Sequence, residues 1–435
     1  MNNELHPVEK GIPKRLKRKI AVAGAILALF GLPAAINLFC IVPFTIFSST
    51  SDTQSYTLMS LLLVFVTTAA GGVIFYHTNR SLNGKPSRPL RLPSALLLMD
   101  IFGASLIVGI FVALYQLVPG LIVPVLLFLA AALPFVWTIS WFSTDRENPK
   151  SSLTWRRGMV AFAGGTSVGL FIAIGLEILV LLLILVLGQN LFASITDNLN
   201  TFFRVLGRTR WIVALTNSSF VFIFLYFTLL TPLIEEVAKP LVTLPVLPHL
   251  NMQETFWIAA IAGAGFAVVE NSLYATLGFS IWMGFLFVRA LGSAVQPLGA
   301  GLVAQGWWKV LHGEPGAWKT WAQRFGIAVV LHVAWNTASL LAILLGETLI
   351  ARNILSRVGW PGLVALGTLF IFLILLGITT LWVGCALWHG KTPVFFKEAS
   401  DEWNAPLNRS MAIWALACLM VILPAGIILS RLWLR

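Results

Sequence analysis

The sequence has few charged residues. Asp, Glu, Lys and Arg together make up 11% of the 435 residues, whereas hydrophobic residues make up 58% and the mean hydropathy is +0.88. A soluble globular domain carries about 25% charged residues, which it needs to cover its surface. This composition therefore excludes a water-soluble fold and indicates a protein whose surface lies largely in lipid.

Cysteine is also scarce, and obvious repeats are missing. Cys40, Cys385 and Cys418 are far apart in the sequence, and each lies in or beside an apolar run. This spacing excludes a disulfide framework and a CxxC metal or redox site. We find no repeat of fixed period and no Gly/Ser-rich linker, so nothing predicts a second soluble domain or inverted transporter halves.

Basic residues exceed acidic ones, giving a net charge of +12 and a pI of about 10.0. They lie between apolar runs rather than in a basic domain, so we exclude nucleic acid as a partner and interpret the charge as topological. Residues 1–19 form a basic segment that we expect in the cytosol, ahead of an uncleaved first span. Arg204, Arg208 and Arg210 are exceptions, because they fall on the opposite predicted side.

The apolar runs predict an all-α, polytopic helical membrane protein. A hydrocarbon core of about 30 Å requires about 20 apolar residues per helix, which gives about eleven transmembrane helices. Their expected ranges are 20–47, 57–76, 94–118, 121–142, 159–187, 211–230, 256–275, 279–304, 325–345, 361–387 and 412–429.

Ionisable residues gather around the end of the sixth span. Ionisable groups within apolar segments are energetically costly, so each needs a partner or a function. On a helix, Lys239 lies four residues after Glu235 and three after Glu236, so it can neutralise one carboxylate and leave the other to titrate separately. Taken alone, this motif is more typical of a charged helix end at the membrane surface.

The next two spans add further polar groups. Phe266, Glu270 and Tyr274 share one helix face, which puts a third carboxylate well inside an apolar helix. The eighth span supplies Arg289, a counter-ion for a buried carboxylate, and Gln296 two turns later.

The ninth span places His332 and Asn336 on one face. A single histidine in a membrane helix more often forms a hydrogen bond between helices, but polar groups at helical spacing in four consecutive segments favour a functional site. Asp100 and Glu177 stand outside these segments, and we interpret them as structural.

Four motifs in this order, EExxK, FxxxENxxY, Arg with Gln, and HxxxN, resemble the PrsW family of intramembrane proteases, which belongs with the CAAX prenyl proteases and bacteriocin-processing enzymes. The resemblance covers residues 231–345 and implies that paired glutamates activate water. The catalytic residues it implies are Glu235, Glu236, Glu270, His332 and Asn336. The supporting residues are Lys239, Phe266, Asn271, Tyr274, Arg289 and Gln296.

Gln296 departs from the family pattern, which usually has a histidine after the arginine. The resemblance suggests zinc, with Glu235, Glu270 and His332 as ligands, but an amide oxygen is a poor substitute for imidazole. A metal-free mechanism therefore stays open, in which a glutamate deprotonates water while Gln296, Asn336 or Arg289 donates to the oxyanion.

These observations predict four regions: the basic segment 1–19, a transmembrane region 20–210, a PrsW-like catalytic core 211–345 and a transmembrane region 346–435. The expected function is an intramembrane endopeptidase that acts on membrane proteins or peptides in the lipid bilayer of a prokaryotic plasma membrane. Two alternatives remain: a catalytically degenerate scaffold or chaperone, and a proton-coupled transporter.

Overall fold

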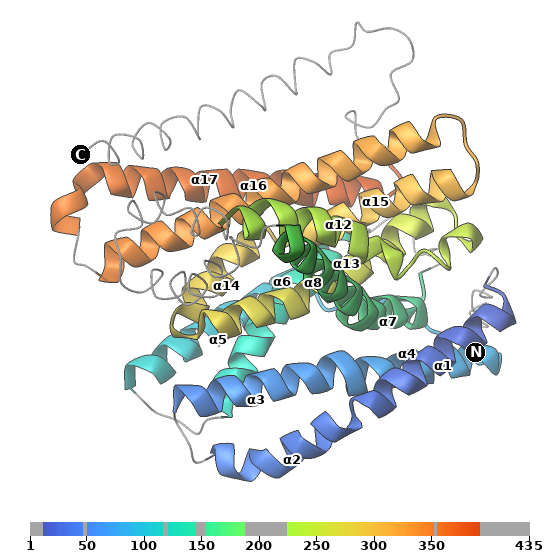
Figure 1. The fold of residues 1–435 in the computed structure, drawn as a ribbon, viewed down its shortest axis with the longest axis horizontal. Helices are drawn as coiled ribbons and strands as arrows, with labels where there is room; N and C mark the ends of the chain where they lie inside the picture. The colour runs from blue at the N-terminus through green and yellow to red at the C-terminus, as the bar shows by residue number, and fades with distance from the viewer. Residues whose placement is uncertain are drawn as a thin grey trace, which may run out of the picture. The chain divides into compact units, whose positions relative to one another are not determined.

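The computed structural model describes residues 12–46, 50–115, 121–143, 153–187, 224–351 and 355–391. Within these ranges the chain forms helices joined by turns and contains no strand, apart from an isolated bridge between Pro89 and Thr154 (Figure 1). The predicted all-α fold is confirmed.

The N-terminal half of the described chain consists of apolar helices, some of which are interrupted by a short π-helix. They are α1 (Lys14–Phe30), α2 (Leu32–Ile46), α3 (Ser51–Val64), the π-helix η1 (Phe65–Ala69), α4 (Ala70–Leu82), α5 (Ala95–Tyr115), α6 (Ile122–Phe142), α7 (Trp155–Gly164), the π-helix η2 (Gly165–Gly169) and α8 (Leu170–Leu187).

The second half of the described chain carries the predicted site. Its elements are the π-helix η3 (Tyr226–Leu230), α12 (Thr231–Leu241), the 3₁₀ turn η4 (Leu247–His249), α13 (Met252–Leu277), the 3₁₀ turn η5 (Phe279–Ile281), α14 (Trp282–Leu291), α15 (Val295–Leu311), α16 (Ala317–Ala351) and α17 (Leu355–Trp388).

Eight described helices are long and apolar enough to cross a membrane, or nine if α14 and α15, bent by 45°, form one broken span. The predicted span 412–429 lies outside the described residues, as do Arg204, Arg208, Arg210 and most of span 211–230. The chain is therefore a multi-pass membrane protein, and the total of eleven spans stays a prediction.

The chain divides into two compact units, each built from two stretches of sequence. Unit 1 comprises Met1–Ala173 and Glu236–Ala328, and unit 2 comprises Ile174–Glu235 and Val329–Arg435. One boundary falls at the peptide bond between Glu235 and Glu236, so the predicted glutamate pair contributes one residue to each unit. The four regions expected from the sequence stay a prediction.

Helix α13 is the centre of unit 1. Its most apolar stretch is 94% buried, whereas no other candidate span in the described part of the chain exceeds 50%. An Asn251–Glu254 capping box starts the helix, and α15, α6 and α7 pack around it. Small residues permit this packing, because a Cβ on Gly265 would lie 2.2 Å from the Phe162 carbonyl oxygen.

Candidate active site

Helix α12 buries the paired glutamates and their lysine. Glu235 is 3% exposed, Glu236 is fully buried and Lys239 is 1% exposed. A charged helix end at the membrane surface would leave such side chains in contact with water. Burial therefore favours a polar site over that simpler interpretation.

Within unit 1, Lys239 forms its ion pair with Glu236. Lys239 Nζ lies 2.6 Å from Glu236 Oε1, and the same ammonium donates a hydrogen bond to Gln296 Oε1 on α15. The Glu236 carboxylate also packs against α15, since a Cβ on Gly299 would lie 2.6 Å from its Oε2. Glu236 is thus held at this place by an ion pair and by close packing.

Gln296 extends this arrangement to a second ion pair. Its Nε2 donates to Glu270 Oε2 on α13 at 2.8 Å, and Glu270 Oε1 lies 2.5 Å from Arg289 Nη2 on α14. Arg289 Nε in turn donates to Asn271 Oδ1. Two carboxylates and two cations are joined through one amide, so their formal charges cancel inside unit 1.

Aromatic rings cover the two cations of this network. Lys239 Nζ lies 5.3 Å from the centroid of the Phe266 ring, and the Arg289 guanidinium carbon lies 5.0 Å from that of Tyr274 and 5.7 Å from that of Phe285. Cation–π attraction stabilises a desolvated cation, which gives Phe266 and Tyr274 a physical role. Sequence reasoning missed Phe285 because no motif spacing marked it.

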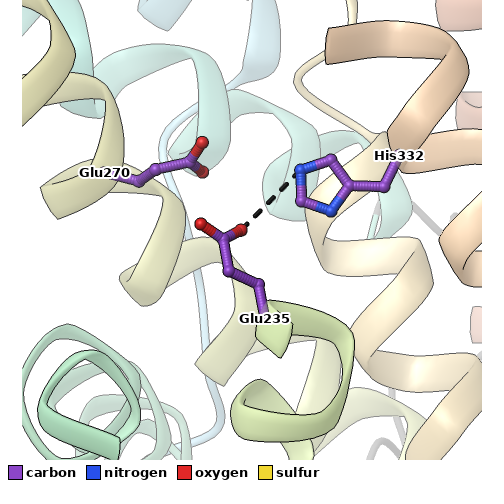
Figure 2. A group of neighbouring side chains, drawn as sticks. All are labelled: Glu235, Glu270 and His332. Carbon is purple, nitrogen blue, oxygen red and sulfur yellow. Dashed lines mark ion pairs between the residues drawn. The ribbon is translucent and has the colours of Figure 1, made fainter. Parts of the chain in front are cut away.

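Unit 2 brings together the other glutamate and the histidine. Glu235 Oε2 lies 3.7 Å from His332 Nε2 on α16, which is an ion-pair distance longer than a hydrogen bond (Figure 2). The His332 side chain is fully buried, and its ring centroid lies 6.2 Å from that of the buried Trp335. The two predicted residues are thus neighbours although 97 positions separate them in the sequence.

Asn336 binds backbone rather than a second side chain. Its Nδ2 donates to the carbonyl oxygen of Phe227 at 3.1 Å, within the π-helix that leads into α12. A π-helix disturbs the regular backbone ladder and so can leave a carbonyl to a side chain. The bond ties α16, which carries His332, to the segment that precedes Glu235. The sequence offered no signal for Phe227, because a backbone acceptor leaves no residue signature.

The two carboxylates interpreted as structural lie elsewhere. Asp100 is exposed on α5, and Glu177 is partly buried on α8.

Both units contain donors suited to a metal ion. Unit 2 contributes Glu235 and His332, and unit 1 contributes Glu270; Figure 2 draws these three side chains. All three are buried, and two carboxylate oxygens with one imidazole nitrogen match the ligand types of catalytic zinc. These donor types suit a metal ion, and within unit 1 Glu270 also accepts hydrogen bonds from Arg289 and Gln296.

A comparison with known families covers the segments that carry this site. Residues 154–378, more than half of the chain, match a family described as PrsW family intramembrane metalloprotease. The match begins just before α7 and ends within α17, so it includes all four motif segments and extends beyond residues 231–345. No curated protein and no solved structure matches the chain.

Proposed function

Because this chain belongs to the PrsW family of intramembrane metalloproteases, we propose that it is an active endopeptidase that hydrolyses peptide bonds within or near the membrane-spanning segments of other proteins. The observation that carries the proposal is the buried pair of Glu235 and His332. A carboxylate and an imidazole, brought together from two helices in a membrane protein, are the groups that hydrolysis by activated water requires.

We assign the general base to Glu235 rather than to Glu236. Glu236 is bound to Lys239, and a carboxylate held in an ion pair with an ammonium is a weaker proton acceptor. Glu235 instead faces the imidazole of His332. In this assignment Glu235 accepts the proton of the attacking water, and His332 orients the carboxylate and stabilises its charge.

A divalent metal would be held by Glu235, Glu270 and His332, the donor set described above. Such an ion supplies Lewis-acid chemistry, because it lowers the pKa of a bound water and polarises a carbonyl. A carboxylate has two oxygens, so Glu235 can offer one as a ligand and use the other for the proton. Arg289 and Gln296 would fix the orientation of the Glu270 carboxylate, as partners of metal ligands commonly do.

The remaining residues are assigned to positioning. Glu236, Lys239 and Gln296 hold α12 against α15, and Asn336 holds α16 against the π-helix η3. We therefore expect Glu236 and Asn336 to affect cleavage through the geometry of Glu235 and His332.

The test compares new protein N-termini in membranes of cells that produce the wild-type chain with those of cells that produce Glu235→Gln. Loss of a general base costs about 10²- to 10⁴-fold in rate. We expect Glu235→Gln and His332→Ala to abolish detectable cleavage and Glu236→Gln to retain part of it. Asp100→Asn, the same carboxylate-to-amide change at an exposed position, should cleave like the wild type.

Two results would contradict these assignments. Wild-type cleavage by Glu235→Gln would remove that residue from the mechanism. If cells that produce the wild-type chain and cells that lack the chain gave the same N-termini, the chain would be a degenerate scaffold or a transporter rather than a protease.

The metal assignment has a separate readout that does not depend on activity. We expect elemental analysis of the purified full-length protein to find about one divalent metal ion per chain. His332→Ala should lose this ion, whereas Asp100→Asn should keep it. A metal-free wild-type preparation that still cleaves in the presence of a chelator would instead support water activation by glutamate alone.

A further inference from the structure

A second feature of unit 1 is an apolar cavity of about 230 Å³ between α1, α4 and α7. Its inner wall includes Ile20, Leu27, Ile74 and Val160. The volume exceeds that of a single water molecule, about 30 Å³, and an apolar cavity of this kind does not hold water well. The wall therefore favours an apolar occupant.

The cavity is lined at one end by three basic residues. Lys17 lies in the first turn of α1, and Arg156 and Arg157 begin α7. Hydrogen bonds to other parts of the chain hold two of them: Lys17 Nζ donates to Ser81 Oγ at 2.8 Å, and Arg156 Nη2 donates to the Lys85 carbonyl oxygen at 2.6 Å. The end of the cavity is thus built from cations whose geometry is already set.

The charged side chains that line this end are basic. Arg157 forms an ion pair with Glu254 at 2.9 Å, but no carboxylate belongs to the lining that the structure describes. The described lining thus carries basic side chains beside an apolar wall. An apolar cavity with a basic end is complementary to an amphiphile that has a hydrocarbon tail and an anionic head.

The predicted topology places the basic end of the cavity on the cytosolic side of the membrane, where anionic lipids of this kind are found. The start of α1, the end of α4 and the start of α7 all lie on the side that the basic loops place in the cytosol. Basic pockets between transmembrane helices on this side bind the head groups of anionic lipids. We propose that this cavity binds one anionic phospholipid, with part of an acyl chain against Ile20, Ile74 and Val160 and the phosphate at Lys17, Arg156 and Arg157.

None of the proposed catalytic residues lines the cavity, so the lipid site is independent of the proposed protease activity. Its test uses native mass spectrometry of the purified full-length protein titrated with dioleoylphosphatidylglycerol, dioleoylphosphatidylcholine or inorganic phosphate. We expect phosphatidylglycerol to bind at least about fivefold more tightly than phosphatidylcholine, since each basic residue near an anionic head contributes about fivefold. Inorganic phosphate should not compete.

Matched variants locate the site. Lys17→Gln should weaken phosphatidylglycerol binding about fivefold. Lys19→Gln removes the same charge at an exposed position outside the lining and should bind like the wild type. Ala23→Trp fills the cavity from its exposed rim and should abolish binding of both lipids, whereas Val22→Trp, on the neighbouring exposed position, should not.

Several results would overturn the proposal. Equal binding of the two phospholipids would remove the role of the basic end, and competition by inorganic phosphate would indicate a site for a free anion. Equal loss in Lys17→Gln and Lys19→Gln, or in Ala23→Trp and Val22→Trp, would indicate general attraction to lipid. If Lys17→Gln failed to fold, Lys17→Arg should fold and bind phosphatidylglycerol like the wild type, and weak binding by that variant would also count against the site.

Discussion

At the scale of single residues, Gln296 shows how one amide can join two ion pairs. Its carbonyl oxygen accepts a hydrogen bond from Lys239 and its Nε2 donates one to Glu270. The partly negative end of the amide thus faces a cation, and the partly positive end faces an anion. Gln296 thus connects two buried charged groups of unit 1.

Replacing Gln296 should show how much this bridge contributes to the free energy of unfolding. Gln296→Leu leaves Lys239 and Glu270 each without one buried hydrogen bond, so we expect it to lower the free energy of unfolding by about 2–3 kcal/mol. A double-mutant cycle with Glu270→Gln, measured by unfolding in detergent, should show coupling between the two positions. Additive effects would mean that the bond at 2.8 Å contributes nothing.

Gly299 should not tolerate a methyl group. A Cβ there would lie 2.6 Å from Glu236 Oε2, so Gly299→Ala must displace a carboxylate that Lys239 holds. We expect a loss of about 1–3 kcal/mol in thermal unfolding. Gly72→Ala on α4, where nothing lies within 4 Å of the added carbon, is the control and should be neutral or slightly stabilising. Equal effects would contradict the close packing of Glu236.

At the scale of elements, helix α13 is positioned by direct backbone contact. A Cβ on Gly165 would lie 1.8 Å from the Ala262 carbonyl oxygen, and one on Gly265 would lie 2.2 Å from that of Phe162. Two glycines on opposite elements thus let α7 with η2 approach α13 closely. Membrane helices commonly associate through small residues in this way.

Gly265→Ala should therefore separate these elements. The contact is with backbone, which cannot move aside as a side chain can, so we expect a loss of more than about 2 kcal/mol and reduced yield of folded protein. Thermal unfolding and size-exclusion chromatography would measure both effects. Gly103→Ala, in the middle of α5 with nothing within 4 Å, provides the comparison; similar behaviour of the two variants would mean that the backbones are farther apart.

At the scale of the whole molecule, charge distribution sets the expected orientation. Basic residues flank alternate apolar helices, and the positive-inside rule places these loops and the N-terminus in the cytosol. The orientation would also place the basic end of the lipid cavity beside the cytosolic leaflet, where anionic lipids are concentrated.

Single-cysteine labelling tests this orientation. In a background with the three native cysteines replaced by serine, Thr50→Cys should react with a membrane-impermeant maleimide in intact cells, because it follows the first span on the outer side. Lys85→Cys, in the basic loop after α4, should react only after the cells are permeabilised. Both positions are exposed, so the reverse pattern would invert the predicted topology.

Local sequence was sufficient to predict the spanning helices and the polar segments. Hydrocarbon leaves an exposed backbone few options besides the helix, and helical spacing places Phe266, Glu270 and Tyr274 on one face. The same spacing groups His332 with Asn336, because residues four positions apart share a helix face. The number of spans and the region boundaries remain predictions, since they depend partly on residues outside the described ranges.

Tertiary structure decided how these groups pair. Lys239 can reach Glu235 or Glu236 along the helix, and only the packing of α15 against α12 assigns it to Glu236. Periodicity likewise could not reveal that Gln296 joins two ion pairs or that Asn336 binds a backbone carbonyl. The contacts of Gln296 and Asn336 connect different elements, and local spacing determines a residue's face but not the helix that the face meets.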